Sequence, residues 1–303
     1  MATDYETLIP SGIADQAIAA AEQESVVLAL GNVIRMGAGV ESIPVVSVAP
    51  SVGFVSPAFG GRKPITQVEW SAERLDPVEI AATLAIPDAF IDDAGFPVWE
   101  SVRSELAKSI AKVLDQAVLF GTNAPAEFPA GGIAGLAGAA QTGATAGEAI
   151  DAALSAVEAQ GVRPSGIASG LSILSAIRKA QIAAGLGPVT GEVESRLFGL
   201  PVETTVNWDA TKGDAVVGDF ASQLIIGIRE DITYELSTDG VLVDPGGVIQ
   251  VSAFQDDMTL LRVHLRVACA VAQPVGPSGS PIVGFEFADW TSGATAHAGR
   301  SKA

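Results

Sequence analysis

The sequence predicts an α+β fold, in which helices and strands follow one another without the regular alternation of a doubly wound sheet. Two segments carry most of this prediction. Residues 98–120 repeat apolar side chains at the spacing of a long helix, and residues 261–271 alternate apolar and polar side chains as a half-buried strand does. Stretches rich in Gly and Pro separate these segments from shorter helices and strands, and no fixed-period repeat is visible.

The first part of the chain is predicted to contain one short helix followed by extended chain. Residues 11–24 favour the helix because they are rich in Ala and Glu and because Ser11 can cap it. Residues 25–37 are predicted to be extended, and residues 42–46 (SIPVV) to form a short strand.

A long hairpin-like excursion is predicted for residues 50–68, where Pro and Gly stand between β-prone residues. Residues 68–87 supply its return arm. Its flexible tip is the sequence Gly60-Gly61-Arg62-Lys63. The two tip bases are the only ones between Arg35 and Arg74, so they form an isolated positive charge on the loop.

The clearest helix is predicted to follow Asp92 or Asp93, either of which can cap it, with Pro97 in its first turn. An apolar residue recurs at every fourth position, and Gly121 can end the helix. At 1.5 Å per residue, such a helix spans roughly 35 Å. Its apolar stripe consists of Val98, Val102, Leu106, Ile110, Leu114 and Val118.

The middle of the chain is predicted to pass through a loop, two helices and several strands. Residues 121–147, rich in Gly, Ala, Pro and Thr, are expected to be a loop, and residues 148–160 a second helix. A third helix is predicted over residues 170–183, with Leu171, Leu174, Ile177 and Ile182 as its apolar set. Strands are predicted at residues 164–169, at 197–206, twice within 213–231, at 232–238 and at 248–254.

The last predicted strand has two chemically distinct faces, because successive side chains of a strand point to opposite sides. The apolar face holds Leu261, Val263, Leu265, Val267, Cys269 and Val271. The other face holds Arg262, His264, Arg266, Ala268 and Ala270.

The composition is globular but strongly acidic, which argues against binding to nucleic acids or anionic membranes. The formal net charge is −18, from 35 acidic and 17 basic residues, whereas phosphate binding needs clustered Lys and Arg. Cys269 is the only cysteine, so neither an intrachain disulfide nor a cysteine-based zinc cluster can form. The first residues lack the features of a signal peptide, and no apolar run is long enough to span a bilayer. We therefore expect a soluble protein that is cytoplasmic when made.

Residues that could carry catalysis are few. His264 and His297 are the only histidines, and we expect His264 to be an ordinary sheet residue beside two arginines. Cys269 falls on the apolar side of its strand and is expected to be a small hydrophobic residue. The Gly-rich run at 131–147 lacks both glycine patterns that bind nucleotides. We therefore expect no catalytic, cofactor or metal site.

Taken in order, four stretches resemble the major capsid protein of tailed phages, the HK-97-type fold. IPVVSVAPSVGFVSPAFGGRKPITQVEW is similar to the extended loop of that family. FPVWESVRSELAKSIAKVLDQAVLFGT, followed by GGIAGL, resembles its long spine helix and the Gly-rich exit. LFGLPVETTVNW with GDAVVGDFASQLIIGIRED resembles the axial domain, and FQDDMTLLRVHLRVACAVAQP the closing strand of the peripheral domain. The resemblance spans roughly residues 20–275.

The resemblance implies a subunit built from separate regions that meet their copies in different ways. These are an N-terminal arm (1–45), an extended loop (46–90), the spine helix with part of the peripheral domain (91–144), an axial domain (145–240), closing strands of the peripheral domain (241–276) and a C-terminal tail (277–303).

What the resemblance implies about function is a virion shell of hexamers and pentamers that encloses double-stranded DNA without sequence-specific binding. Assembly would take place in the cytoplasm of the bacterial host and involve no membrane. A separate scaffold protein is expected because Met1 stands almost directly before the arm, and a portal and a decoration protein are further expected partners.

Intersubunit contacts are expected at the loop tip and on the last strand. Arg62 and Lys63, which follow Gly60 and Gly61 in the tip, would bind acidic residues of an adjacent subunit or would simply be solvated. Arg262 and Arg266 likewise face another subunit or solvent.

Some members of the family weld the shell with Lys–Asn isopeptide bonds. Lys63 could supply the lysine, but no Asn follows Asn207, so the acceptor is missing and no crosslinking is expected.

Two other functions stay open at the level of sequence. The first is an encapsulin-type compartment that holds an enzyme, which gene neighbours would distinguish from a phage head. The second is a metabolic enzyme whose site the sequence does not reveal, and a small soluble oligomer at all concentrations would favour it.

Overall fold

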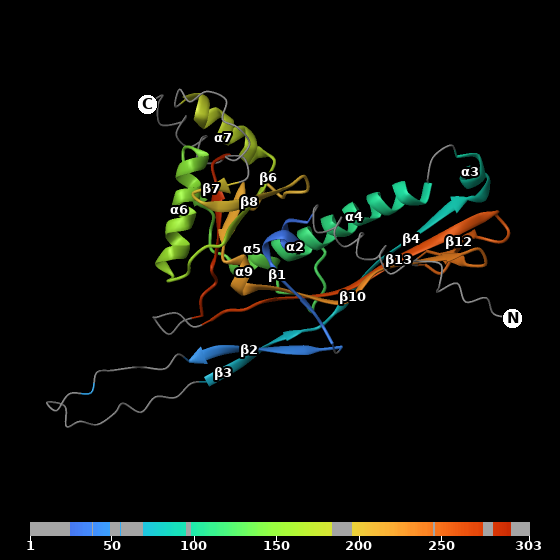
Figure 1. The fold of residues 1–303 in the computed structure, drawn as a ribbon, viewed down its shortest axis with the longest axis horizontal. Helices are drawn as coiled ribbons and strands as arrows, with labels where there is room; N and C mark the ends of the chain where they lie inside the picture. Colours follow the sequence, from blue (N-terminus) through green and yellow to red (C-terminus); the bar gives the residue numbers. More distant parts are fainter. Residues whose placement is uncertain are drawn as a thin grey trace.

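A long helix, α4 (Val98–Phe120), runs along one face of a four-stranded sheet and ends beside a six-stranded sheet in the computed structural model of the chain (Figure 1). Parallel and antiparallel strand pairs both occur, and helices cover parts of both sheets, so the fold is a mixed one of helices and strands. The structure describes residues 25–37, 39–48, 55, 69–94, 98–183, 196–244, 246–274 and 281–291.

The four-stranded sheet forms the floor under α4. Its order is β1 (Asn32–Arg35), β10 (Leu224–Ser237), β13 (Met258–Val271) and β4 (Val78–Pro87). The β1–β10 pair is parallel and the other two pairs are antiparallel. Leu106 and Ile110 of α4 belong to the same buried cluster as Val263 of β13. The predicted stripe of the helix and the predicted apolar face of the last strand are therefore confirmed as two sides of one core.

The six-stranded sheet carries a second helical layer. Its order is β5 (Gln141–Thr142), β14 (Phe285–Asp289), β9 (Ala215–Gly218), β6 (Gly166–Gly170), β8 (Leu200–Thr205) and β7 (Arg196–Leu197). The helices α6 (Ala146–Ala159) and α7 (Ser172–Ala183) share a buried cluster with one face of it. Phe287 of β14 points to the other face and joins the cluster beneath α4, so the two sheets share one core.

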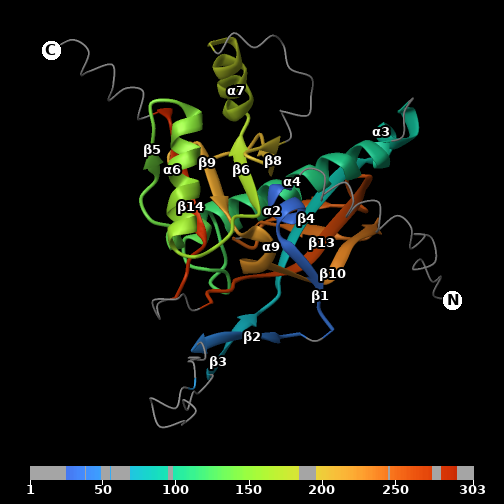
Figure 2. The same ribbon diagram turned by 60° about the vertical axis from the view of Figure 1, so that its left-hand side comes forward.

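Two β-hairpins project from opposite ends of the molecule (Figures 1 and 2). One is the ribbon of β2 (Glu41–Val48) and β3 (Glu69–Leu75), which we call the loop ribbon. The other is the pair β11 (Val241–Val243) and β12 (Ile249–Ser252), beside α3 (Asp88–Asp93), which we call the tip hairpin. Val45 and Leu75 anchor the base of the loop ribbon on the face of the four-stranded sheet opposite to α4.

The end of α4 depends on glycines that tolerate no side chain. Gly121 has a φ of 67°, and a Cβ there would lie 2.4 Å from the Cα of Gly131. Gly132 has a φ of 62°, and a Cβ there would lie 2.5 Å from the carbonyl oxygen of Val118. The chain can turn back against the helix only because these residues lack a Cβ. The predicted helix end at Gly121 is thus confirmed.

Several predicted elements differ in the structure. Residues 25–37, predicted to be extended, begin with the helix α2 (Val26–Leu30), whose start is capped by Ser25. Asp92 and Asp93 lie inside α3 and not at the start of α4. The predicted loop at 121–147 contains the short helix α5 (Gly132–Leu136) and β5, because its small residues pack closely under α4.

The predicted apolar set of α7 is wrong at its first member. Leu171 is half exposed, whereas Ile173 is fully buried, because the helix begins at Ser172 and its apolar stripe follows the helical spacing from there. Ile177 is buried as predicted.

Sheet membership divides the chain differently from the ranges proposed on sequence. β4 pairs with β13, although residues 68–87 were expected to return along the excursion. β9 and β10, separated by the short helix α9 (Phe220–Gln223), enter different sheets. β14, within the predicted tail, pairs with β9. The predicted helix at 11–24 and the loop tip lie outside the described residues.

Candidate assembly surfaces

The described side chains do not form a catalytic constellation. Among these residues no three His, Cys, Asp or Glu side chains come together as metal ligands would. None of the described helices combines the length and the hydropathy that crossing a bilayer requires. His264 lies on β13 with its Nε2 atom 3.5 Å from Glu230 Oε1, and its Nδ1 atom is buried without a described partner. His297 lies outside the described residues.

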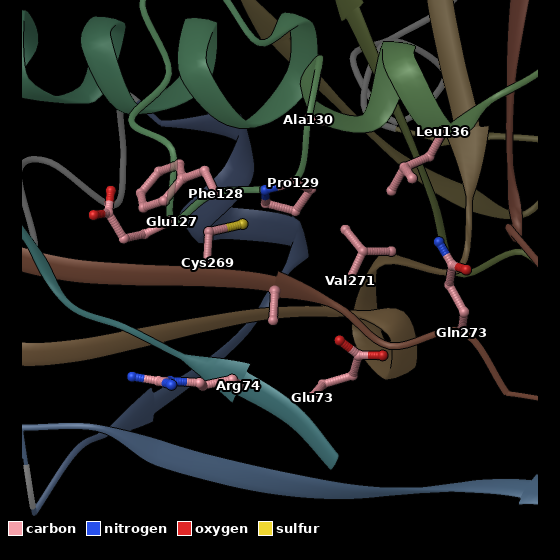
Figure 3. Close-up of a pocket in the computed structure, with 11 residues that line it drawn as sticks. Glu73, Arg74, Glu127, Phe128, Pro129, Ala130, Leu136, Cys269, Val271 and Gln273 are labelled. Carbon is pink, nitrogen blue, oxygen red and sulfur yellow. The ribbon is translucent and has the colours of Figure 1, made fainter. Parts of the chain in front are cut away.

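A groove of about 250 Å³ lies where the loop ribbon leaves the body (Figure 3). Phe128, Pro129 and Val271 line it with apolar surface. Glu73 and Arg74 of β3 lie at one side, and Arg74 is held in an ion pair with Asp76 at 2.9 Å. The groove is thus lined by apolar side chains together with Glu73, Arg74, Glu127 and Cys269.

Cys269 lines this groove, but its thiol is inert. The residue is 2% exposed, and burial raises the pKa of its thiol to about 12. Only on the order of 10⁻⁴ of the thiol is therefore ionised at pH 8, and the thiolate is the reactive form. We expect the native protein to resist a maleimide at pH 8 and to react fully once guanidinium has unfolded it. Rapid labelling of the native protein would contradict the burial of this thiol.

The face of the four-stranded sheet away from α4 carries a row of charged side chains. Arg262 of β13 forms an ion pair with Glu235 of β10. Arg266 lies in register between Glu79 of β4 and Glu230 of β10. The structure thus brings the two predicted contact arginines onto one exposed face, together with His264, but already gives Arg262 an acidic partner within its own chain. Exposed ion pairs of this kind contribute little to stability.

Large apolar side chains are exposed on both projecting hairpins. On the loop ribbon, Trp70 is 65% exposed and stands opposite Val46 in the strand register. Most residues of β3 are exposed, apart from the base at Leu75. A two-stranded ribbon has marginal stability in water by itself. A surface of this kind is expected to be covered by another molecule.

The tip hairpin is the second exposed apolar surface. Phe254 is 82% exposed and Ile249 is 64% exposed. Residues 236–260 also contain four Asp and no Lys, Arg or His, so the apolar side chains are surrounded by negative charge alone. The exposed apolar members are Leu236, Val241, Val243, Val248, Ile249 and Phe254.

Sequence reasoning missed these two apolar surfaces. Trp70 and Phe254 both stand in segments predicted to be strands, and a strand places half of its side chains against a core. The missing information was that each hairpin has no second layer above it. One signal was present for the tip hairpin, since the apolar residues stand in a stretch, residues 236–260, that contains no basic residue.

The described residues present exposed apolar surfaces and no metal-ligand cluster, as expected of a structural protein that acts through contacts with other subunits. The phage capsid family matches residues 6–276, so the chain belongs to that family. It is a phage major capsid protein, a structural component of the virion that assembles into capsomers of an icosahedral shell, and it is not an enzyme. No curated protein sequence matches the chain.

Solved structures agree with this assignment. One from Microbacterium phage Oxtober96 is 27% identical, with a TM-score of 0.73, and the match covers 88% of this chain and 91% of that one. One from Mycobacterium phage Cain is 26% identical, with a TM-score of 0.73 and coverage of 93% and 95%. The capsid of a native GTA particle shares the fold at 19% identity, with a TM-score of 0.58 and coverage of 86% and 89%.

Proposed function

We propose that the chain tiles the head of a tailed double-stranded DNA phage as hexamers and pentamers, through contacts at both projecting hairpins. The observation that carries this proposal is the exposure of Trp70 on the loop ribbon and of several apolar side chains at the tip hairpin, at opposite ends of the molecule. A contact at each end lets one subunit touch several neighbours. Many weak contacts made together then hold a shell more firmly than any single one.

The subunit divides into two rigid units in this proposal. The six-stranded sheet with α6 and α7 is the axial unit, which meets its copies around the centre of a capsomer. The four-stranded sheet with α4 as its spine is the peripheral unit. The axial unit of this proposal follows the predicted range 145–240 only up to α9. We assign β10 to the peripheral unit, because β10 pairs with β13. The two units share one packed core, which deforms little, so the arms and hairpins that project from it must absorb the difference between five-fold and six-fold positions.

The extended loop reaches a neighbouring subunit in this arrangement. Its tip, with Gly60, Gly61, Arg62 and Lys63, carries the only bases between Arg35 and Arg74. Acidic partners are abundant on a chain with a net charge of −18. Arg266, placed between two glutamates of its own sheet, is a second contact in the proposal, and Arg262 contributes through its pair with Glu235.

Further partners follow from the head function and not from the described residues. We propose a separate scaffold protein, a portal at one vertex and a decoration protein on the outside. The enclosed DNA is held without sequence-specific contacts, since an acidic wall repels phosphate over a distance of about 8 Å in physiological salt.

Reversing the charge at the loop tip tests the proposed loop contact. The variant Arg62→Glu with Lys63→Glu is expected to lower the yield of shells at least tenfold, because two attractions become repulsions, while the free energy of unfolding of the subunit stays unchanged. Shells are counted on a density gradient and stability is measured by urea unfolding. Arg163→Glu with Lys212→Glu makes the same change of charge elsewhere on the described surface. Normal shell yield in the tip variant would contradict the loop contact.

Subunits are expected to remain covalently separate in the shell. Because no Asn follows Asn207, an isopeptide partner for Lys63 is missing from the printed sequence. Purified shells boiled in detergent should therefore run as single subunits on a gel. A ladder of higher bands would overturn this expectation.

A further inference from the structure

A buried carboxylate joins the start of the described chain to the long helix. Asp115 of α4 is 1% exposed. Its Oδ1 atom accepts a hydrogen bond from the Ser25 hydroxyl at 2.6 Å and another from the Val27 amide at 3.2 Å. Its Oδ2 atom accepts one from the Val26 amide at 3.2 Å. One side chain of α4 thus satisfies two of the amides that the first turn of α2 leaves without a helical partner.

The same contact fixes Ser25, the first described residue, and the start of α2 to the body. Ser25 also accepts a hydrogen bond from the Leu28 amide at 3.2 Å, so its hydroxyl links the cap of α2 to Asp115. Val26 and Val27 are buried in the main core. Beyond α2, the four-residue strand β1 is the next attachment of this segment to the body. The Asp115 contact is therefore the first attachment of the described chain to the core.

The surroundings of this carboxyl group supply no opposite charge. Its hydrogen-bond partners among the described residues are a neutral hydroxyl and two neutral amides. α2 itself carries no acidic or basic residue. α4 and β8 both contact α2. Their charged groups Lys112 and Glu203 have exposed side chains. The ionised carboxylate is therefore held by hydrogen bonds alone in a site closed to water.

We propose that Asp115 is a proton-dependent latch that controls how firmly Ser25 and α2 are held against α4. The proposal concerns a joint within one subunit and does not depend on how subunits are arranged in the shell.

The direction of the effect follows from linkage. Burial raises the pKa of Asp115 from 3.8 to about 6, although the hydrogen bonds from Ser25, Val27 and Val26 each lower it. When α2 detaches, the carboxyl group meets water and its pKa returns toward the lower value. The closed joint therefore binds the proton more tightly than the open one, so the latch is firmest below the open-state pKa and loosens as the pH rises through about 6.

Amide hydrogen exchange on the assembled or free full-length chain measures the latch directly. After correction for the intrinsic pH dependence of exchange, the protection of residues 26–31 is expected to fall by about 60-fold between pH 4 and pH 7, since the pKa differs by about two units between the closed and open joint. Peptides from β6 serve as the reference, and their protection should not follow the same curve.

Two variants separate the latch from a general effect of pH. Asp115→Asn removes the titrating group, so the pH dependence of the 26–31 peptide should vanish. Ser25→Ala keeps the carboxyl group but removes a hydrogen bond that lowers its pKa, so the midpoint of the curve should move to higher pH. A purely structural role of Ser25 would weaken protection equally at every pH.

Three results would overturn the proposal. They are a corrected protection of residues 26–31 that is independent of pH in the unmodified chain, an unchanged pH dependence in Asp115→Asn, and an unmoved midpoint in Ser25→Ala. The Ser25→Ala midpoint decides the matter if Asp115→Asn does not fold.

Discussion

Replacing Phe287 with alanine is expected to lower the free energy of unfolding by about 3–5 kcal/mol. Phe287 is 2% exposed and lies where the two sheets share a core. Its ring centroid is 6.4 Å from that of Phe120 at the end of α4 and 6.5 Å from that of Trp208. Truncation removes apolar contact and leaves a cavity between parts that cannot collapse together, because α4 and the sheet are both rigid. Urea unfolding followed by far-ultraviolet circular dichroism measures the change.

The matched control for this substitution is Phe254→Ala, in the turn just after the tip hairpin. Phe254 is 82% exposed in the single chain, so its truncation should change the free energy of unfolding by less than about 0.5 kcal/mol. If the two variants lost similar stability, the division between the shared core and the exposed tip would be wrong.

Replacing Trp70 with alanine is expected to raise the protein concentration needed for shell assembly by at least about 30-fold. Buried tryptophans are typical anchors of protein interfaces, and truncating such an anchor costs about 2 kcal/mol or more. In the single chain the side chain is 65% exposed, so the subunit should keep its stability within about 0.5 kcal/mol. Light scattering across a concentration series, with urea unfolding of the same samples, gives both quantities.

Trp70→Phe is the conservative companion of that variant, because it keeps an aromatic ring on the loop ribbon. We expect it to restore most of the lost assembly. A Trp70→Ala chain that assembles at the normal concentration would show that the loop ribbon does not need this side chain at an interface.

The elements that the sequence predicted best are those determined by residues close to one another in the chain. The stripe of α4 and the alternation of β13 are periodic over many residues, and each needs only one apolar partner surface. The end of the helix at Gly121 could also be predicted, since the turn there excludes a Cβ. The order of family motifs then indicated the capsid fold, which the family match confirmed.

What the sequence could not predict is decided by contacts between distant residues. β4 joins the sheet through its register with β13, in which Leu265 stands opposite Ile80. No local sequence pattern indicates that pairing. The partner of Arg262 is Glu235, 27 residues away on the next strand. Asp115 is buried because α2 covers it, and the five residues of α2 carry too short a pattern for helix prediction.

The shell function gives these features a common physical reason. A subunit that must fit symmetry-distinct positions in an icosahedral shell has to keep its core unchanged and vary only the parts that project from it. The shared core beneath α4 provides the rigid part, and the projecting hairpins provide contact surface that no core covers. A chain organised in this way needs no reactive side chain, and the one thiol is kept buried.

Electron microscopy of the concentrated full-length chain, alone and with the proposed scaffold protein, tests the central claim most directly. Assembly through the two hairpins predicts hollow, closed particles of uniform size. A chain that remains a small soluble oligomer at every concentration, even with scaffold supplied, would contradict the claim that this protein works by tiling with its own copies.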